Sequence, residues 1–273
     1  MLHAIEDVQD THVHSPLNPP CSAPYVPHSH HEAMKPSDRE KWPAAMEDEL
    51  QKLLTLDAWE LVDLPPGTRA IANKWVYSLK DKAKGLADAT REKARIVAWG
   101  DRQIYGIDYD ETYASVIKLV SLRIMLTVAA IRDLDLKHWY VVAAFIKGKL
   151  TEPVYMRQPA SFEDGTSRVC KLKSSWYDLC QSARAWYGCL DEVMGLLSWH
   201  RLHADYAIWV SPAGDEFVGA HVDDMAVAAS KETRHALKHH LRQHFQVTNL
   251  GDLHMYVGLT IERDRKSRTI YLS

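Results

Sequence analysis

The sequence predicts an α+β fold in which helices pack against an antiparallel sheet. Strand-like and helix-like segments follow one another as strand, helix, strand, Asp-Asp, strand, helix, which is a split βαβ order. At its centre, two short apolar runs flank Asp223 and Asp224. They lack proline and contain alternating, β-branched residues, as in a β-hairpin. With 273 residues, 46% hydrophobic and 25% charged, the chain has the composition of a globular protein with a sizeable core.

The first part of the chain, residues 1–31, has no hydrophobic period and is predicted to be a disordered leader. It contains several prolines and six of the fifteen histidines. No cysteine or carboxylate framework accompanies those histidines, so we assign them to the leader and not to a metal site. After it, a capping-box pattern from Ser37 to Glu40 and apolar residues at helical spacing up to Leu54 predict a helix. Pro43 complicates the start of that helix, and we expect the regular part to begin near it.

Three segments with period-two alternation follow, at residues 58–62, 74–80 and 93–99. In the two longer strands, alternation places the cationic side chains on one face and the apolar ones on the other. Nine basic and four acidic residues lie in 69–103, whereas eight acidic and three basic residues lie in 37–63. The pattern predicts an acidic outer helix and a basic sheet face, which is either a phosphate-binding surface or simply a solvated one.

The remaining elements are predicted from periodicity and from their prolines and turns. They are a helix at 119–131, a strand at 138–146, an edge strand at 152–156, helices at 181–199 and 232–245, and strands at 255–262 and 269–272. His235 and His239 lie four residues apart on the last helix. The intervening residues lack the glutamate of a zinc-protease helix, so we expect a solvated face.

Membrane and secretory classes are not indicated. No apolar run approaches the roughly 18 residues that span a bilayer, and the N-terminus lacks a signal-peptide pattern. The four cysteines have no CxxC or zinc-type spacing, so we expect reduced thiols in an intracellular protein that is not secreted.

Two adjacent carboxylates at the tip of an apolar hairpin repel each other with little solvent to screen them. A divalent cation such as Mg²⁺ would relieve that repulsion, because it prefers carboxylate oxygen and is commonly held by one or two carboxylates beside substrate phosphates. The alternative is an ordinary Asp-rich turn. Taken alone, the hairpin favours the turn.

Ten separate motifs decide between these readings. They are Trp42-x-x-Ala45-Met46-x-x-Glu49, Trp59-x-Leu61-Val62, Lys74-Trp75-Val76, Lys93-Ala94-Arg95-x-Val97-Ala98, Tyr109-Asp110-Glu111-Thr112, Ala144-Phe145-x-x-Gly148, Tyr155-Met156-x-Gln158-Pro159, Gln181-Ser182-x-Arg184-x-Trp186, Val222-Asp223-Asp224 and Leu250-Gly251-x-Leu253. In these motifs and their order the chain, from about residue 32 to 273, resembles the reverse transcriptase domain of copia-type LTR retrotransposons.

The resemblance implies a polymerase-type palm at about 119–273, a β-rich fingers subdomain at about 55–118, and a chain that stops before a thumb or RNase H domain. It implies RNA-directed DNA polymerisation by two-metal nucleotidyl transfer, with two Mg²⁺ or Mn²⁺ ions about 3.5–4 Å apart. The implied partners are an RNA/DNA template-primer and dNTPs, with no membrane; the oligomeric state is left open.

Residue by residue, the resemblance assigns metal binding and catalysis to Asp223 and Asp224, and nucleotide binding to four residues. Lys93 and Arg95 would contact the triphosphate, which suits a cationic fork. Phe145 would exclude a 2′-hydroxyl, and Gln181 would line the nucleotide and template pocket.

The third carboxylate of the family is absent, because Tyr140 stands in its place. A phenol that titrates near pH ~10 is a poor Mg²⁺ ligand at neutral pH. Asp135, five residues earlier, is expected on the opposite face and about 16 Å away along the strand. His221 stands where the family has a tyrosine in the hairpin. Asp178 stands where the family has a glycine in a turn, a residue that commonly adopts a positive φ. Further departures are Cys180, for a lysine, and Ser115, for a proline.

These departures predict a degenerate reverse transcriptase domain. Two alternatives remain open from the sequence: a non-catalytic nucleic-acid-binding module that keeps the basic face, and an element remnant without a present function.

Overall fold

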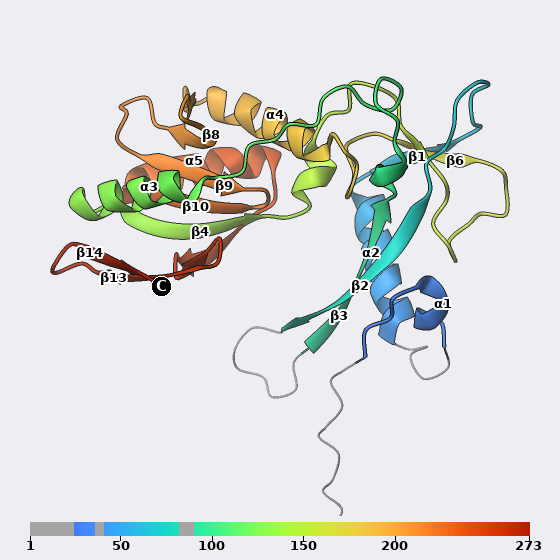
Figure 1. The fold of residues 1–273 in the computed structure, drawn as a ribbon, viewed down its shortest axis with the longest axis horizontal. Helices are drawn as coiled ribbons and strands as arrows, with labels where there is room; N and C mark the ends of the chain where they lie inside the picture. The colour runs from blue at the N-terminus through green and yellow to red at the C-terminus, as the bar shows by residue number, and fades with distance from the viewer. Residues whose placement is uncertain (1–24, 36–40, 82–89) are drawn as a thin grey trace, which may run out of the picture.

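The computed structural model describes residues 25–35, 41–81 and 90–273, and it has two lobes (Figure 1). One lobe is built on a six-stranded antiparallel sheet with three helices, and the other on one long helix, a two-stranded ribbon and a three-stranded sheet. Each lobe has its own cluster of buried apolar side chains. The α+β class and the antiparallel sheets predicted from the sequence are therefore present.

The six-stranded sheet has the strand order β11-β4-β10-β9-β8-β7. Its strands are β4 (Asp135–Val141), β7 (His200–Leu202), β8 (Asp205–Val210), β9 (Phe217–His221), β10 (Asp224–Ala229) and β11 (Val247–Asp252). The helices of this lobe are α3 (Leu119–Ile131), α4 (Ser182–Gly195) and α5 (Lys231–His244). Strand β4 pairs with β10 along its length, although almost ninety residues separate them, and this pairing positions the site.

The second lobe contains α1 (His30–Ala33), α2 (Lys41–Thr55), β1 (Trp59–Val62), β2 (Asn73–Asp81), β3 (Thr90–Ala98), the short helix η1 (Gly100–Arg102), β5 (Tyr155–Met156) and β6 (Val169–Leu172). Strands β1, β6 and β5 form the three-stranded sheet, with β5 at its edge as its nearby proline predicts. A short helix, η2 (Ala144–Lys147), follows β4. The chain finishes with β12 (Met255–Tyr256), β13 (Leu259–Asp264) and β14 (Thr269–Leu272).

The ribbon of β2 and β3 has the predicted two faces. Trp75 and Tyr77 are buried on one face, together with Ile96 from the partner strand, whereas Lys74 and Val76 on the other face are exposed. The buried face packs against α2, where the ring of Trp42 meets that of Tyr77 edge-on at 5.3 Å. Burying a large apolar side chain in this way contributes about 1.5–3 kcal/mol, which is why the alternation sets the strand orientation.

The predicted helices at 119–131, 181–199 and 232–245 are confirmed as α3, α4 and α5, with α3 matching at both ends. The strand predicted at 138–146 is wrong in its second half. The chain leaves the sheet after Val141, Ala143 takes a φ of +53°, and η2 begins. The last backbone bonds between this segment and the neighbouring strands run from Val141 N to Asp223 O at 2.8 Å and from Val142 N to Gln246 O at 2.9 Å, just before the turn at Ala143.

Residues 1–24 of the predicted leader, and the capping box at 37–40, lie outside the described residues. The last residues of the leader are folded onto the second lobe. Ser29 caps α1 by accepting a hydrogen bond from the Glu32 amide at 3.2 Å, and Ala33 is fully buried. No helix in the described part of the chain is both long and apolar enough to cross a bilayer.

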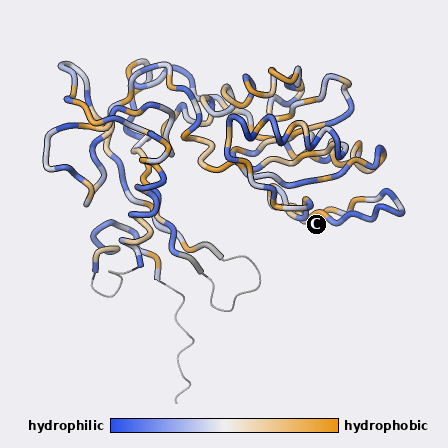
Figure 2. The backbone as a smooth tube through the Cα atoms, turned by 180° about the vertical axis from the view of Figure 1, so that it is seen from behind, coloured by the Kyte–Doolittle hydropathy of each residue, from blue (hydrophilic) through white to orange (hydrophobic). Residues whose placement is uncertain are grey.

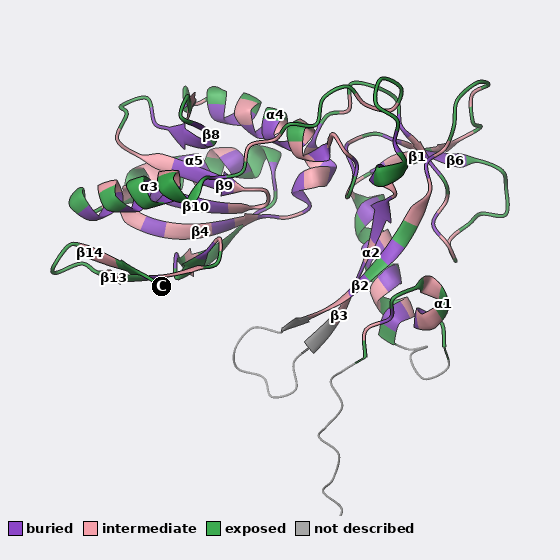
Figure 3. Cartoon of the chain, viewed as in Figure 1, coloured by how far each residue is buried: buried purple, intermediate pink, exposed green. Residues whose placement is uncertain are grey.

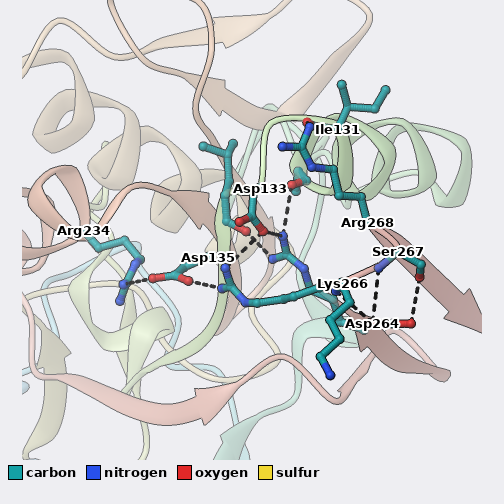
Figure 4. Close-up of polar contacts among 12 residues, drawn as sticks. Ile131, Asp133, Asp135, Arg234, Asp264, Lys266, Ser267 and Arg268 are labelled. Atoms are coloured by element: carbon teal, nitrogen blue, oxygen red, sulfur yellow. Dashed lines mark hydrogen bonds and ion pairs between the residues drawn. The ribbon is translucent and has the colours of Figure 1, made fainter.

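An aspartate–arginine cluster fastens the C-terminal hairpin of β13 and β14 to the six-stranded sheet (Figure 4). Asp135 pairs with Arg234 of α5 and with Arg265, while Asp133 accepts from Arg263 at 2.8 Å and from Arg265 at 3.1 Å. The tip of the hairpin beyond this cluster is hydrophilic (Figure 2). Burial opposes ionisation of Asp135, but Arg265 and Arg234 outweigh it and hold the pKa of this carboxyl below its usual range.

Replacing Asp135 with asparagine is expected to lower the free energy of unfolding by about 1–2 kcal/mol at neutral pH, because charge-assisted hydrogen bonds are lost. The folded-state pKa lies below the unfolded value of about 3.9, so the stabilisation is present above that pH and disappears as the pH falls below it. Urea unfolding at several pH values measures this difference. The exposed pair of Asp57 and Lys173 supplies the control, since Asp57→Asn should cost less than about 0.5 kcal/mol. An Asp135→Asn difference that does not shrink in acid would contradict the assignment.

Candidate functional site

The two carboxylates lie where β9 turns into β10, at the end of the sheet that faces the second lobe (Figure 1). The turn consists of Val222 and Asp223, and Asp224 already pairs with His221 across the hairpin. Val222 has a φ of +58°, an unusual conformation for a β-branched residue. Backbone strain of this kind persists only where surrounding contacts hold it, and it is common at functional sites.

Helix α4 supplies those contacts. Trp186 Nε1 donates to Val222 O at 2.8 Å, and the Val222 amide donates to the Tyr187 hydroxyl at 3.2 Å. The same hydroxyl donates to Ala220 O at 3.1 Å. Both aromatic residues are buried, and β10 behind the turn is buried along nearly its whole length (Figure 3). The turn that carries the aspartates is therefore fixed from behind by a helix.

Each aspartate has a side-chain hydrogen-bond partner on β4. The Nε2 atom of His138, on β4, lies 2.8 Å from Asp224 Oδ1, close enough to donate a hydrogen bond. The side chain of Tyr140, two residues further along β4, makes a hydrogen bond with the side chain of Asp223. His138 and Tyr140 lie on the same face of the strand because they are two residues apart.

Tyr140 stands directly opposite Asp224 in the strand register. Burial raises the pKa of its phenol to about 12, and the negative charge of Asp223 acts in the same direction. Tyr140 therefore keeps its proton at neutral pH. The position at which the resemblance expects a third carboxylate is occupied by a neutral group that bonds to one of the remaining two.

Within the described part of the chain, no other acid takes its place. Asp135 lies opposite Ala229, at the far end of β10 from Asp224, and both of its oxygens are held by arginines. Among the residues that the structure describes, no three His, Cys, Asp or Glu side chains are grouped so that they could hold a metal ion. Two carboxylates beside a protonated phenol do not fit the pair of ions that the resemblance implies.

The predicted nucleotide-binding residues gather only in part. Arg95 on β3 and Phe145 on η2 both approach the ring of Tyr177, with the guanidinium carbon 5.9 Å from the ring centre and the two rings edge-on at 6.2 Å. Arg95 is also near enough to Tyr140 to favour its ionised form. Lys93 lies two residues earlier on β3, opposite Ser78. Arg95, Phe145 and Tyr140 thus all lie near Tyr177, an aromatic residue that the motifs did not single out.

Gln181 lies at the beginning of α4 and forms hydrogen bonds with two segments, at Gln103 and at Asp108. Its Oε1 accepts from Gln103 Nε2 at 3.2 Å, and its Nε2 donates to the Asp108 carbonyl at 3.2 Å. Its side-chain amide is therefore already engaged at both ends within the protein.

A family model described as "Reverse transcriptase (RNA-dependent DNA polymerase)" matches residues 56–273, about four fifths of the chain. The chain belongs to this reverse transcriptase family. It is 34% identical over 253 residues to the retrovirus-related Pol polyprotein from transposon TNT 1-94 of Nicotiana tabacum, covering 90% of this chain and 19% of that protein. It is 34% identical over 230 residues to the Pol polyprotein from transposon RE1 of Arabidopsis thaliana, covering 82% of this chain and 16% of that protein.

These similarities confirm the resemblance to copia-type elements, and the chain spans less than one fifth of the length of these relatives. One departure noted in the sequence has a visible consequence. Asp178 stands at the expected glycine position and has a φ of +64°, so the turn does use the left-handed conformation. The opposing Gly100 could not carry a side chain, because a Cβ there would lie 1.9 Å from the Asp178 carbonyl oxygen.

Proposed function

We propose that this reverse transcriptase domain binds a template-primer but does not carry out two-ion nucleotidyl transfer. In this proposal the six-stranded sheet and its helices act as the palm, and the lobe with the basic ribbon acts as the fingers. The bounds that the resemblance implies, about 119–273 and about 55–118, differ from these lobes because α2, β5 and β6 belong to the second lobe. The observation that carries the proposal is the place of Tyr140, opposite Asp224 and hydrogen-bonded to Asp223.

The charge at the hairpin supports this reading. Two-ion phosphoryl transfer places two divalent cations about 3.5–4 Å apart, and neighbouring carboxylates must offset their mutual repulsion. The hairpin offers two carboxylates, and the third position holds a phenol that keeps its proton until about pH 12. Two carboxylates are enough for one Mg²⁺ beside substrate phosphates, but they leave a second ion without an anionic ligand of its own.

The contacts between the lobes support retained binding. Arg95 and Phe145 both lie close to the Tyr177 ring, which brings together a cation for phosphate and two aromatic side chains for a sugar or base. Lys74 is exposed and lies on the same face of the ribbon as Val76, opposite the buried Trp75. A surface of this composition suits a nucleic-acid strand whether or not the hairpin is active.

Primer extension on an RNA template tests the proposal. The purified chain, with Mg²⁺ or Mn²⁺ and all four dNTPs, is expected to extend the primer no faster than the Asp223→Asn variant, which removes one of the remaining ligands. Template-primer binding by both proteins is measured in the same buffer. Retained binding shows that a lack of extension is not caused by a lack of bound substrate. Extension by the unaltered chain that Asp223→Asn abolishes would refute the loss of catalysis.

A further inference from the structure

Helix α5 carries a ridge of positive charge that the proposed function does not use. Arg234, Lys238 and Arg242 are spaced four residues apart, so their side chains lie along one side of the helix. Like charges at this spacing destabilise a helix. Burial, followed by the charges of Arg242 and Arg234, lowers the pKa of Lys238, so its surroundings disfavour the ammonium ion.

Arg234, at one end of this ridge, and the nearby arginines of β13 and its turn are neutralised by carboxylates. Within the described residues, the other two cations of the ridge, Lys238 and Arg242, are not. Arg234 pairs with Asp135, and Arg263 and Arg265 pair with Asp133 (Figure 4). Within residues 25–35, 41–81 and 90–273, neither Lys238 nor Arg242 forms an ion pair. Arg242 donates from Nε and Nη2 to Val247 O, at 3.3 Å each, which leaves further N–H groups of its guanidinium for a ligand.

Beyond Arg242, the end of α5 and the start of β11 line a shallow, open surface pocket of about 750 Å³. Residues 242–249 line it, and none of them is an acid. Arg242 brings a positive charge, Gln243, Gln246 and Asn249 bring amides, and Thr248 brings a hydroxyl. A pocket with cationic and amide donors and no carboxylate matches the hydrogen-bond acceptors of a phosphate group.

The pocket adjoins the hairpin. Thr248 pairs with Tyr140 on one side of β4, and Asp224 pairs with Tyr140 on the other. Two strand spacings of about 4.8 Å place Thr248 about 10 Å from Asp224 on the same sheet face. Strand β11, whose first residues also line the pocket, therefore lies between the hairpin and the outer edge of this sheet.

We propose that this α5–β11 pocket, together with Lys238 one helical turn before it, binds backbone phosphates of an RNA or DNA strand, with Arg242 and Lys238 as the cations. The proposal rests on the proposed function in one respect, namely that the chain binds nucleic acid. It adds a second contact region, separate from the basic β2–β3 ribbon.

The test is fluorescence anisotropy with a labelled single-stranded RNA of about 20 nucleotides, titrated over a range of salt concentrations. Lys238→Ala with Arg242→Ala is expected to weaken binding about 10-fold at about 0.1 M salt and to make the slope of log affinity against log salt shallower by about 1.4, because each lost phosphate contact removes about 0.7 for single strands. Lys238→Ala alone should give about half that change in slope. The single Lys238→Ala variant keeps the test decisive if Arg242, which also donates to Val247 O, proves necessary for folding.

The matched control is Lys149→Ala with Lys171→Ala, which removes the same charge from two exposed lysines that are paired with Glu192 and Glu60. It is expected to change the slope little. A parallel variant, Lys93→Ala with Arg95→Ala, reports on the ribbon. If that variant loses binding while both α5 variants bind as the unaltered chain does, the α5–β11 site is refuted and the proposed function stands. If the unaltered chain binds no RNA, both are refuted.

Discussion

Replacing Trp186 with alanine is expected to lower the free energy of unfolding by about 3–5 kcal/mol, the usual cost of truncating a buried tryptophan. The side chain has no exposed surface, and its ring meets that of Phe245 edge-on at 5.1 Å. Its Nε1 is also the donor to Val222 O, at 2.8 Å, in the strained turn. The substitution therefore opens a cavity between α4 and the sheet and releases the turn that carries Asp223.

Urea unfolding measures the change, and two variants separate its causes. Trp186→Phe keeps most of the ring but leaves the Val222 carbonyl without its donor, so it should cost about 1–3 kcal/mol. Leu196, just after the same helix, is 68% exposed, and Leu196→Ala should stay within about 0.5 kcal/mol of the unaltered chain. A Trp186→Ala variant as stable as Leu196→Ala would show that this helix does not hold the hairpin.

Elements set by local periodicity were predictable from the sequence. The apolar pattern of residues 119–131 fixes a helix at both ends, and the alternation around Trp75 fixes which face of the ribbon is buried. The run from Tyr140 to Ile146 was not predictable in this way, because it is apolar throughout and contains neither glycine nor proline. Its last sheet bonds go to Asp223 and Gln246, which are distant in sequence, and the chain then turns at Ala143 with a left-handed φ.

The same distinction applies to the candidate site: residue identities were predictable from the sequence, whereas contacts between distant segments were not. The motifs identify Asp223 and Asp224, and the residue type at position 140 shows that the third carboxylate is missing. The contact of His138 with Asp224, and the place of Tyr177 between Arg95 and Phe145, follow from strand pairing and from the approach of the two lobes. No spacing in the sequence signals these contacts, although Tyr177 lies within a few residues of a recognised motif.

Replacing Tyr140 with aspartate is expected to create a three-carboxylate group, because positions paired directly across two strands hold their Cβ atoms about 4.5–5.5 Å apart. Without metal, the added charge beside Asp223 and Asp224 should lower the free energy of unfolding by about 1–3 kcal/mol. Mn²⁺ should recover that loss by binding the folded state alone. Tyr140→Asn introduces a side chain of similar size to aspartate but without charge. It is the matched control and should gain no stability from Mn²⁺. Thermal unfolding with and without the ion measures both.

Direct titration of Mn²⁺ into the unaltered chain and into Tyr140→Asp, followed by the electron paramagnetic resonance signal of the free ion, tests the role of Tyr140 most directly. We expect the variant to bind two ions per chain and the unaltered chain to bind at most one, weakly, with that binding lost in Asp223→Asn. Binding of two Mn²⁺ ions by the unaltered chain as tightly as by Tyr140→Asp would contradict the conclusion that Tyr140 has replaced an essential ligand.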